Sequence, residues 1–311
     1  MLPVRIAYAA LGSGSAPVWA AQEAGIFGDE GLDAEVVLIR GSGNVTRALL
    51  ANEVQFANIA APLVVDANLR GGDLVFLTGG LNWLIQSLVV RPEILDVEQL
   101  RRRTLGVAAH AGGVDDYIIP YLLERHGLDP KADLQSRPVD SQPDAIEKLI
   151  AGEIDAALFS PPYVFEAVKR GLRVLIDGGA LRIDYQLGGI VASRAFVDKH
   201  GDLTRRVVRA YVGGVHWYKT NPDLMLAVFR RYSRIEDEAV ARQTYAAVDP
   251  YFQPAPYPSV PGIQTILDQA AVRDPAARAL QATALIDDRW VAELEHSGVI
   301  AALYAGGANA R

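Results

Sequence analysis

The chain has no cysteine and only two methionines among its 311 residues. Without cysteine, the protein has no thiol nucleophile, no Cys-ligated zinc and no iron–sulfur cluster. No apolar run approaches the ~20 residues of a membrane-spanning helix. Basic residues are also scarce, since 30 Lys and Arg stand against 37 Asp and Glu and give a formal net charge of −7. This acidic balance provides no electrostatic surface for nucleic acid or anionic lipid.

What the sequence does contain is typical of a folded protein with two domains. Half of the residues are apolar and 22% are charged, which excludes a disordered chain. A length of 311 residues suits two domains of ~150 residues each. The first residues lead from Met1 directly into an apolar run and show no export signal. We expect a periplasmic or extracytoplasmic location if a signal peptide was removed, and a cytoplasmic one if the native chain starts at Met1.

Short apolar runs alternate with amphipathic stretches over residues 1–190. The apolar runs predict strands at residues 4–9, 34–39, 54–60, 74–78, 84–90, 104–108, 155–160, 173–176 and 189–192. The amphipathic stretches predict helices at residues 16–24, 44–51, 62–69, 114–125, 143–150 and 162–169. This alternation is typical of βαβ units with mostly parallel sheets. After about residue 194 the pattern is mainly helical, with a proline-rich interruption at residues 250–261.

An internal repeat with an offset of 100 residues indicates how these units are arranged. Residues 47–72 align without a gap with residues 147–172, and nine pairs are identical. Ordinary composition gives roughly two such matches by chance. Each copy ends a helix, begins a strand and enters a new helix with proline near its first turn. The repeat predicts two related α/β lobes.

We expect lobe I to comprise residues 1–90 and 190–311, and lobe II to comprise residues 91–189. Pro92 disfavours helix at the preceding residue and marks the first boundary. The run at residues 190–192 is expected to return to the first sheet, which creates two crossovers. Two lobes joined in this way enclose a cleft, and the carboxyl ends of their strands are expected to face it.

The segments after the predicted strands suit an anionic ligand. They are small, polar or glycine-rich and precede helices, so backbone N–H groups at the helix N-termini are available to hold an anion. For any single loop, plain turn residues with N-caps at Ser15 and Asn44 explain the pattern as well. Five such loops on one side of two related sheets favour a site. The candidate ligand-binding residues are Ser13, Gly14, Gly43, Asn44, Ala61, His110, Gly112, Gly113, Asp115, Ser160 and Gly188.

Further candidates are the polar and aromatic residues Trp19, Asn82, Trp83 and Tyr163, each of which is equally well explained as part of the core. If they line the cleft, the ligand has an apolar or flat part beside its anionic group. His110 is either a hydrogen-bond donor to that ligand or, with Asp115 or Asp116, an acid–base pair.

The sequence lacks the residues that nucleotide binding, metal binding and serine hydrolysis require. A dinucleotide-binding fingerprint would need glycine at position 17, which is proline, and there is no Walker lysine. The five histidines show no metal-ligand spacing. No serine lies in a G-x-S-x-G elbow. We therefore expect no metal and no cofactor.

Several segments together resemble one protein family. Residues 14–27 (GSAPVWAAQEAGIF), 31–35 (GLDAE), 50–57 (LANEVQFA), 149–157 (LIAGEIDAA) and 188–193 (GGIVAS) are similar to substrate-binding proteins of ABC importers for nitrate, sulfonate, taurine and thiamine precursors. The resemblance covers nearly the whole chain. It implies the type II periplasmic-binding fold, in which each lobe is a mostly parallel sheet flanked by helices, here with a helical C-terminal region.

The resemblance implies a monomeric solute-binding protein. It would capture a small organic anion, such as a sulfonate, an aromatic carboxylate or a pyrimidine-like molecule, and deliver it to an ABC permease. Closure is expected at hinges near residues 90–92 and 187–189. The alternative is a cytosolic lyase or decarboxylase on the same scaffold with His110 and Asp115 as acid–base groups. The Cys-rich motif of related pyrimidine-precursor synthases is missing, which argues against their chemistry.

Overall fold

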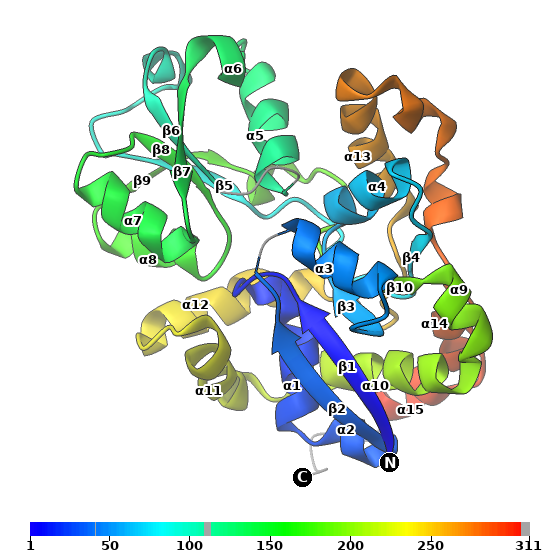
Figure 1. Cartoon of the computed structure of the whole chain (residues 1–311). Coiled ribbons are helices and arrows are strands. Elements are labelled where there is room, and N and C mark those ends of the chain that lie inside the picture. The colour runs from blue at the N-terminus through cyan, green and yellow to red at the C-terminus, as the bar shows by residue number, and fades with distance from the viewer. Residues whose placement is uncertain (41, 109–112, 306–311) are drawn as a thin grey trace.

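The computed structural model describes residues 1–40, 42–108 and 113–305. Figure 1 shows two α/β lobes, with the helices of the C-terminal part packed mainly around the first lobe. Lobe I is built on the first sheet and lobe II on the second. Within the described ranges, no helix has both the length and the apolar character needed to cross a membrane.

The sheet of lobe I has five strands in the order β2-β1-β3-β10-β4. Strands β1 to β3 run parallel, whereas β10 is antiparallel to both of its neighbours. The bounds are β1 (Leu2–Tyr8), β2 (Leu32–Leu38), β3 (Phe56–Asn58), β4 (Leu74–Phe76) and β10 (Ile190–Ser193). The predicted return of residues 190–192 to the first sheet is confirmed.

The sheet of lobe II repeats this plan in the order β7-β6-β8-β5-β9. Its strands β6, β7 and β8 are parallel, and β5 lies antiparallel between β8 and β9. The bounds are β5 (Ser87–Val90), β6 (Thr104–Ala108), β7 (Gln135–Val139), β8 (Ala156–Phe159) and β9 (Arg173–Asp177). In each lobe, therefore, the strand that has crossed over from the other lobe takes the antiparallel place.

Turns with a left-handed residue recur 100 residues apart, at the same offset as the sequence repeat. Asn52 and Gly152 have φ of 56° and 73°, and Gly71 and Gly171 have φ of 88° and 89°. Glycine and asparagine are the residues that adopt this left-handed conformation at least cost. The 100-residue repeat thus extends from the sequence to the turns that end its helices.

Two strand predictions need correction. The run at residues 84–90 was expected in lobe I, but β5 pairs with β8 and β9 and so belongs to lobe II. The first crossover therefore precedes Ser87 and does not lie at residues 90–92. Strand β7 was not predicted, because its side chains are mostly exposed and Pro138 interrupts any alternation. Such a strand is tolerated at the edge of a sheet, which is where β7 lies.

The two crossovers run side by side between the sheets. Leu187 donates its N–H to the carbonyl of Leu81 over 2.8 Å, and Leu84 donates to Ile183 over 2.9 Å. At Gly189, which has φ of 142°, a Cβ would lie 2.1 Å from the carbonyl oxygen of Thr78. The hinge is therefore a two-stranded ribbon with closely approaching backbones. The predicted hinge at residues 187–189 lies in this ribbon.

Helices cover both sheets. Lobe I begins with α1 (Ala16–Glu23), α2 (Ile26–Asp29), α3 (Ser42–Leu50) and α4 (Ala61–Leu69). Lobe II has α5 (Asp115–Glu124), α6 (Pro130–Asp133), α7 (Gln142–Ile150) and α8 (Tyr163–Lys169). The C-terminal part, predicted to be helical, adds α9 (Arg194–Lys199), α10 (Gly201–Thr220), α11 (Pro222–Ser233), α12 (Glu238–Val248), α13 (Val260–Arg273), α14 (Arg289–His296) and α15 (Val299–Ala305).

The long helix α10 packs directly against α1. A Cβ at Gly214 would lie 2.1 Å from the carbonyl oxygen of Pro17, so glycine permits this close approach. Farther along the chain, α12 contacts α8 of lobe II. The C-terminal part thus supports lobe I and also reaches across to the other lobe.

Candidate interlobe ligand site

The two lobes touch where β1 and β8 end. The N–H and the Oγ of Ser13, in the 3-10 turn Ser13–Ser15 after β1, both donate to the carbonyl of Pro161 over 3.1 and 3.0 Å. A Cβ at Gly12 would lie 2.9 Å from Oγ of Ser160, so glycine allows this approach. Ser13 is fully buried. The carboxyl ends of the two sheets therefore face each other, as the repeat predicted.

Asn58 holds the Gly14 turn against the second crossover. Its side-chain amide donates to the carbonyl of Gly14 over 3.0 Å and its Oδ1 accepts the N–H of Gly189 over 2.8 Å. The N–H of Ala61 donates to Gln186 over 2.9 Å. Gln186 also donates to the carbonyl of Gly188. In this conformation, the N–H groups of Ser13 and Ala61 are thus already paired within the protein.

On one side of the cleft, hydrogen bonds join α8 to the segment between α11 and α12. The hydroxyl of Tyr163 donates to the carbonyl of Ser233 over 2.9 Å, and Oγ of Ser233 donates to Leu11 over 2.8 Å. Lys169 forms an ion pair with Asp237. Burial raises the pKa of the Tyr163 hydroxyl to about 12, so this group remains a donor at neutral pH.

On the opposite side, α4 and α13 meet α5. The Tyr117 hydroxyl is hydrogen-bonded to Asp66, and the guanidinium of Arg273 lies 3.7 Å from the centre of the Tyr117 ring. Burial raises the pKa of the Asp66 carboxyl, although the Tyr117 hydrogen bond and the charge of Arg273 oppose the shift. These three residues, from three elements, form a second contact across the lobes.

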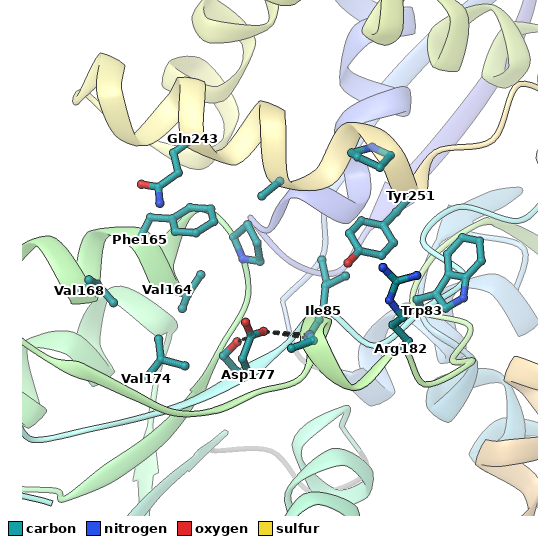
Figure 2. Close-up of a pocket in the computed structure, with 16 residues that line it drawn as sticks. Trp83, Ile85, Val164, Phe165, Val168, Val174, Asp177, Arg182, Gln243 and Tyr251 are labelled. Atoms are coloured by element: carbon teal, nitrogen blue, oxygen red, sulfur yellow. Dashed lines mark hydrogen bonds between the residues drawn. The ribbon is translucent and has the colours of Figure 1, made fainter. Parts of the chain in front are cut away.

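Figure 2 shows a pocket of about 790 Å³. Pro161 lines it, so the pocket lies next to the Ser13–Pro161 contact. It lies at the carboxyl edge of the second sheet, where Ser87 pairs with Phe159 and with Asp177. Lobe II contributes α8 and β9 to its walls, and the C-terminal part contributes α12 and the turn after it. The volume is within the range of ~300–1,000 Å³ typical of small-molecule sites. The residues that line it and enter the argument below are Trp83, Val164, Phe165, Val168, Val174 and Tyr251.

The ends of this pocket differ in character. Figure 2 shows Arg182, Trp83 and Tyr251 at one end, and apolar side chains of α8 and β9 at the other. The rings of Trp83 and Tyr251 lie 5.8 Å apart at 52°. Arg182 is exposed and forms no ion pair with any residue that the structure describes. Its φ of 50° places it in the left-handed region at the end of a 3-10 turn.

One acidic side chain also borders the pocket. Oδ1 of Asp177 accepts the N–H groups of Gly179 and Ala180 over 3.0 and 3.3 Å and the Ser87 hydroxyl over 3.5 Å. Asp177 thereby caps the turn that leads to Arg182. Its carboxylate places a negative charge along the floor of the pocket.

The remaining candidate ligand-binding residues are distributed over exposed, hydrogen-bonded and buried positions. Gly43 and Asn44 are exposed at the start of α3, where Asn44 hydrogen-bonds Arg40 and Arg47. The Asn82 amide donates to Tyr257 over 2.9 Å. Ser160 is paired with Gln142, and Gly113 is buried just before α5. His110 and Gly112 lie outside the described residues.

Trp19 belongs to the core of lobe I. Its side chain is fully buried, stacks on Tyr232 with ring centres 5.2 Å apart and meets Tyr8 edge-on at 5.6 Å. Both faces and edges are therefore covered by protein. Of the aromatic candidates, Trp83 alone lines the pocket.

Asp115 is the first residue of α5 and follows the end of β6. Its Oδ2 accepts the N–H of Ala108 over 3.0 Å. Part of the side chain is accessible to solvent, but the surrounding protein desolvates the carboxylate and raises its pKa to about 6, against a smaller lowering by the Ala108 hydrogen bond. Asp116 lies beside it and raises the pKa further. An acid–base pair with His110 stays a prediction.

Sequence reasoning missed Arg182 and Tyr251. Arg182 lies in an irregular segment before β10, and Tyr251 ends the 3-10 turn after α12, about 70 residues farther along the chain. The Arg182 segment follows the predicted strand at residues 173–176 but leads to β10 instead of into an α-helix, and the Tyr251 segment follows a helix. No cluster of metal-ligating side chains occurs among residues 1–40, 42–108 and 113–305.

Comparison with known proteins agrees with this arrangement. The model of the NMT1-like family matches residues 2–228. The chain belongs to the NMT1-like family. Among curated proteins, it is 27% identical over 241 residues to YtlA of Bacillus subtilis (strain 168), provisionally named a binding protein, covering 70% of this chain and 72% of that one.

Solved structures share the fold. The periplasmic aliphatic sulphonate-binding protein SsuA of Escherichia coli superposes with a TM-score of 0.71 at 17% identity, covering 90% of this chain and 89% of SsuA. The periplasmic nitrate-binding protein NrtA of Synechocystis PCC 6803 gives a TM-score of 0.75 at 13% identity, covering 97% and 91%. The predicted periplasmic-binding fold and the family resemblance are thereby confirmed.

Proposed function

We propose that this member of the NMT1-like family is a solute-binding protein that captures a small organic anion between its lobes and delivers it to an ABC importer. The observation that carries the proposal is the pocket of about 790 Å³ that lies between the lobes and contains an arginine without an ion-pair partner among the described residues. A concave, largely apolar site with few polar groups is typical of small-molecule binding.

The names of similar proteins support the same class of function. SsuA is named for sulphonate and NrtA for nitrate, both of which are anions. By analogy with these periplasmic proteins, we propose that the mature chain works outside the cytoplasm, as a monomer that meets its permease after closing on the ligand.

The mechanism follows from the hinge. The two-stranded crossover ribbon allows the lobes to separate, whereas the Ser13–Pro161 contact and the flanking contacts hold them together. A ligand that touches both lobes binds the closed form better than the open one and so shifts the population toward closure. Closure then presents a continuous surface of both lobes to the permease.

Native mass spectrometry of the purified full chain tests the proposal. We expect one small organic anion per chain, or stoichiometric binding of an added carboxylate or sulfonate by calorimetry and a raised melting temperature. A chain that carries no small molecule and binds no organic anion would contradict it.

The alternative function, a lyase, predicts a different result in an experiment on the same protein. A binding protein returns its ligand unchanged when a hundredfold excess of ligand is incubated with it. Conversion of that excess into product would instead support an enzyme. Asp115→Asn serves as the matched variant, because it removes the ionisable group of the alternative while Oδ1 of asparagine can still accept the Ala108 N–H.

A further inference from the structure

We infer that the pocket selects monoanions with an extended apolar body, that Arg182 binds the anionic group and that the apolar wall of α8 and β9 holds the body. This inference rests on the proposed function and specifies its ligand class. It concerns the flank of the cleft between α8 and α12, away from the turns after β1, β2 and β6 where the sequence placed the anion.

The anionic end is defined by charge and by its surroundings. Arg182 lines the pocket with Trp83 and Tyr251, and no carboxylate among the described residues lies within ion-pair distance of it. A guanidinium binds a carboxylate or sulfonate through two parallel hydrogen bonds. The half-buried rings of Trp83 and Tyr251 line the same end and offer apolar surface beside the exposed guanidinium.

The other end of the pocket suits an apolar group. Val164, Phe165 and Val168 on α8, together with Val174 on β9, form one wall. Val168 is 46% exposed, so its side chain has apolar surface that a bound group can cover. Opposite them, Ala247 of α12 leaves room that a larger side chain would fill. An alkyl or aryl body bound here removes apolar surface from water on both sides.

Asp177 explains why the ligand carries one negative charge rather than two. Its carboxylate borders the pocket between the apolar wall and the Arg182 end, as Figure 2 shows. A second anionic group on the ligand would lie near this carboxylate or beside the valine side chains, where the neutral amide of Gln243 does not balance its charge.

A panel of probes on the wild-type full chain tests the ligand class by calorimetry. Octanoate and octanesulfonate should bind more tightly than suberate, a dianion with the same number of carbons, by at least about tenfold. Lengthening hexanoate to octanoate should increase affinity by up to roughly fourfold per buried methylene. Octylammonium, with the same number of carbons and the opposite charge, should bind at least about tenfold more weakly than octanoate.

Two variants with matched controls test the residues. Arg182→Gln should weaken octanoate binding by at least about tenfold, whereas Arg173→Gln, which removes an exposed arginine at the far end of β9, should leave it unchanged. Ala247→Phe should weaken octanoate far more than butanoate. Ala246→Phe, on the exposed face of the same helix, should affect neither.

The outcomes separate this inference from the proposed function. If the chain binds an organic anion and neither Arg182→Gln nor Ala247→Phe changes its affinity, the inference is overturned and the proposed function stands. Tighter binding of suberate than of octanoate has the same meaning. If the wild-type chain binds no organic anion at all, both are overturned.

Discussion

The two lobes share one plan but differ in what covers them. Both sheets have a crossed-over antiparallel strand in the fourth position, and both repeat the left-handed turns at Gly71 and Gly171. The C-terminal helix α10 packs against α1 of lobe I, whereas lobe II meets the C-terminal part at α12 and α13. The pocket lies where this symmetry fails, because α12 belongs to neither repeat. We conclude that the repeated units form the two sheets and that the C-terminal part, which is not repeated, forms part of the site.

The largest expected effect concerns the core position that differs between the lobes. Trp19 in α1 corresponds to Ile119 in α5, and both are buried. Trp19→Ala should lower the free energy of unfolding by about 3–5 kcal/mol and Ile119→Ala by about 2–5 kcal/mol. Denaturant titration measures both values.

Trp19→Phe is the control for this pair, since it keeps an aromatic ring in the core. It should retain ligand affinity. Reduced affinity in a folded Trp19→Phe protein would mean that Trp19 acts on the ligand as well as on the core of lobe I.

The second effect is a pH dependence of stability that arises in lobe II and has no counterpart at the same helix of lobe I. The first turn of α1 has no acidic residue, whereas α5 begins with Asp115 and Asp116. The pKa of Asp115 is about 6 in the folded protein and 3.8 as its ordinary value, so the folded state binds the proton more tightly. Stability should therefore fall as pH rises from about 4 to about 6 and stay lower above that range.

Asp115→Asn should abolish this decrease and make the protein more stable by about 1–3 kcal/mol at pH 7, with no gain at pH 4. Urea unfolding of both proteins at the two pH values measures the difference. An equal stability change at pH 4 and pH 7 would show that the effect does not come from ionisation of Asp115.

The third effect concerns the contact between the lobes. Tyr117→Phe removes the hydroxyl that is hydrogen-bonded to Asp66 across the cleft but keeps the ring below Arg273. We expect a loss of about 1 kcal/mol from the closed form and therefore roughly fivefold weaker ligand binding. Calorimetric titration of the variant with octanoate measures the change, and Tyr121→Phe on the same helix is the control. Unchanged affinity in Tyr117→Phe would show that this contact does not contribute to closure.

The smallest effect tests the repeat itself. Gly152→Asn places at the turn of lobe II the residue that lobe I has at Asn52, where φ is 56°. Asparagine tolerates the left-handed region, so stability should change by less than about 0.5 kcal/mol. Gly71→Ala and Gly171→Ala should each cost about 1 kcal/mol, because both backbones are left-handed and nothing crowds either position. Unequal costs for the two alanine variants would show that the turns are not equivalent.

Much of the fold was predictable because the information is local. The strands of both sheets except β7 followed from apolar runs, and the repeat with its shared Pro62 and Pro162 paired the lobes. The sheet to which Ser87–Val90 belongs was not predictable, because an apolar run says nothing about its partner strand. Strand β7 exposes its side chains and so lacks the burial pattern on which such predictions depend.

Less of the candidate site was predictable. Trp83 was identified and lines the pocket, whereas Trp19, with the same signal of an aromatic residue near a strand end, is part of the core. Arg182 and Tyr251 come together only through the packing of α12 against lobe II. That contact joins segments about 70 residues apart, so it produces no periodic pattern in the sequence from which it could be predicted.

Hydrogen–deuterium exchange of the full chain, with and without octanoate, tests most directly whether both lobes bind one ligand. We predict protection of the lining segments 177–182 of lobe II and 243–251 of the C-terminal part. Residues 11–15 of lobe I, which contact Pro161 in the closed form, should be protected at the same saturation concentration. Protection confined to one lobe, or no protection when calorimetry shows the ligand bound, would contradict binding between the lobes.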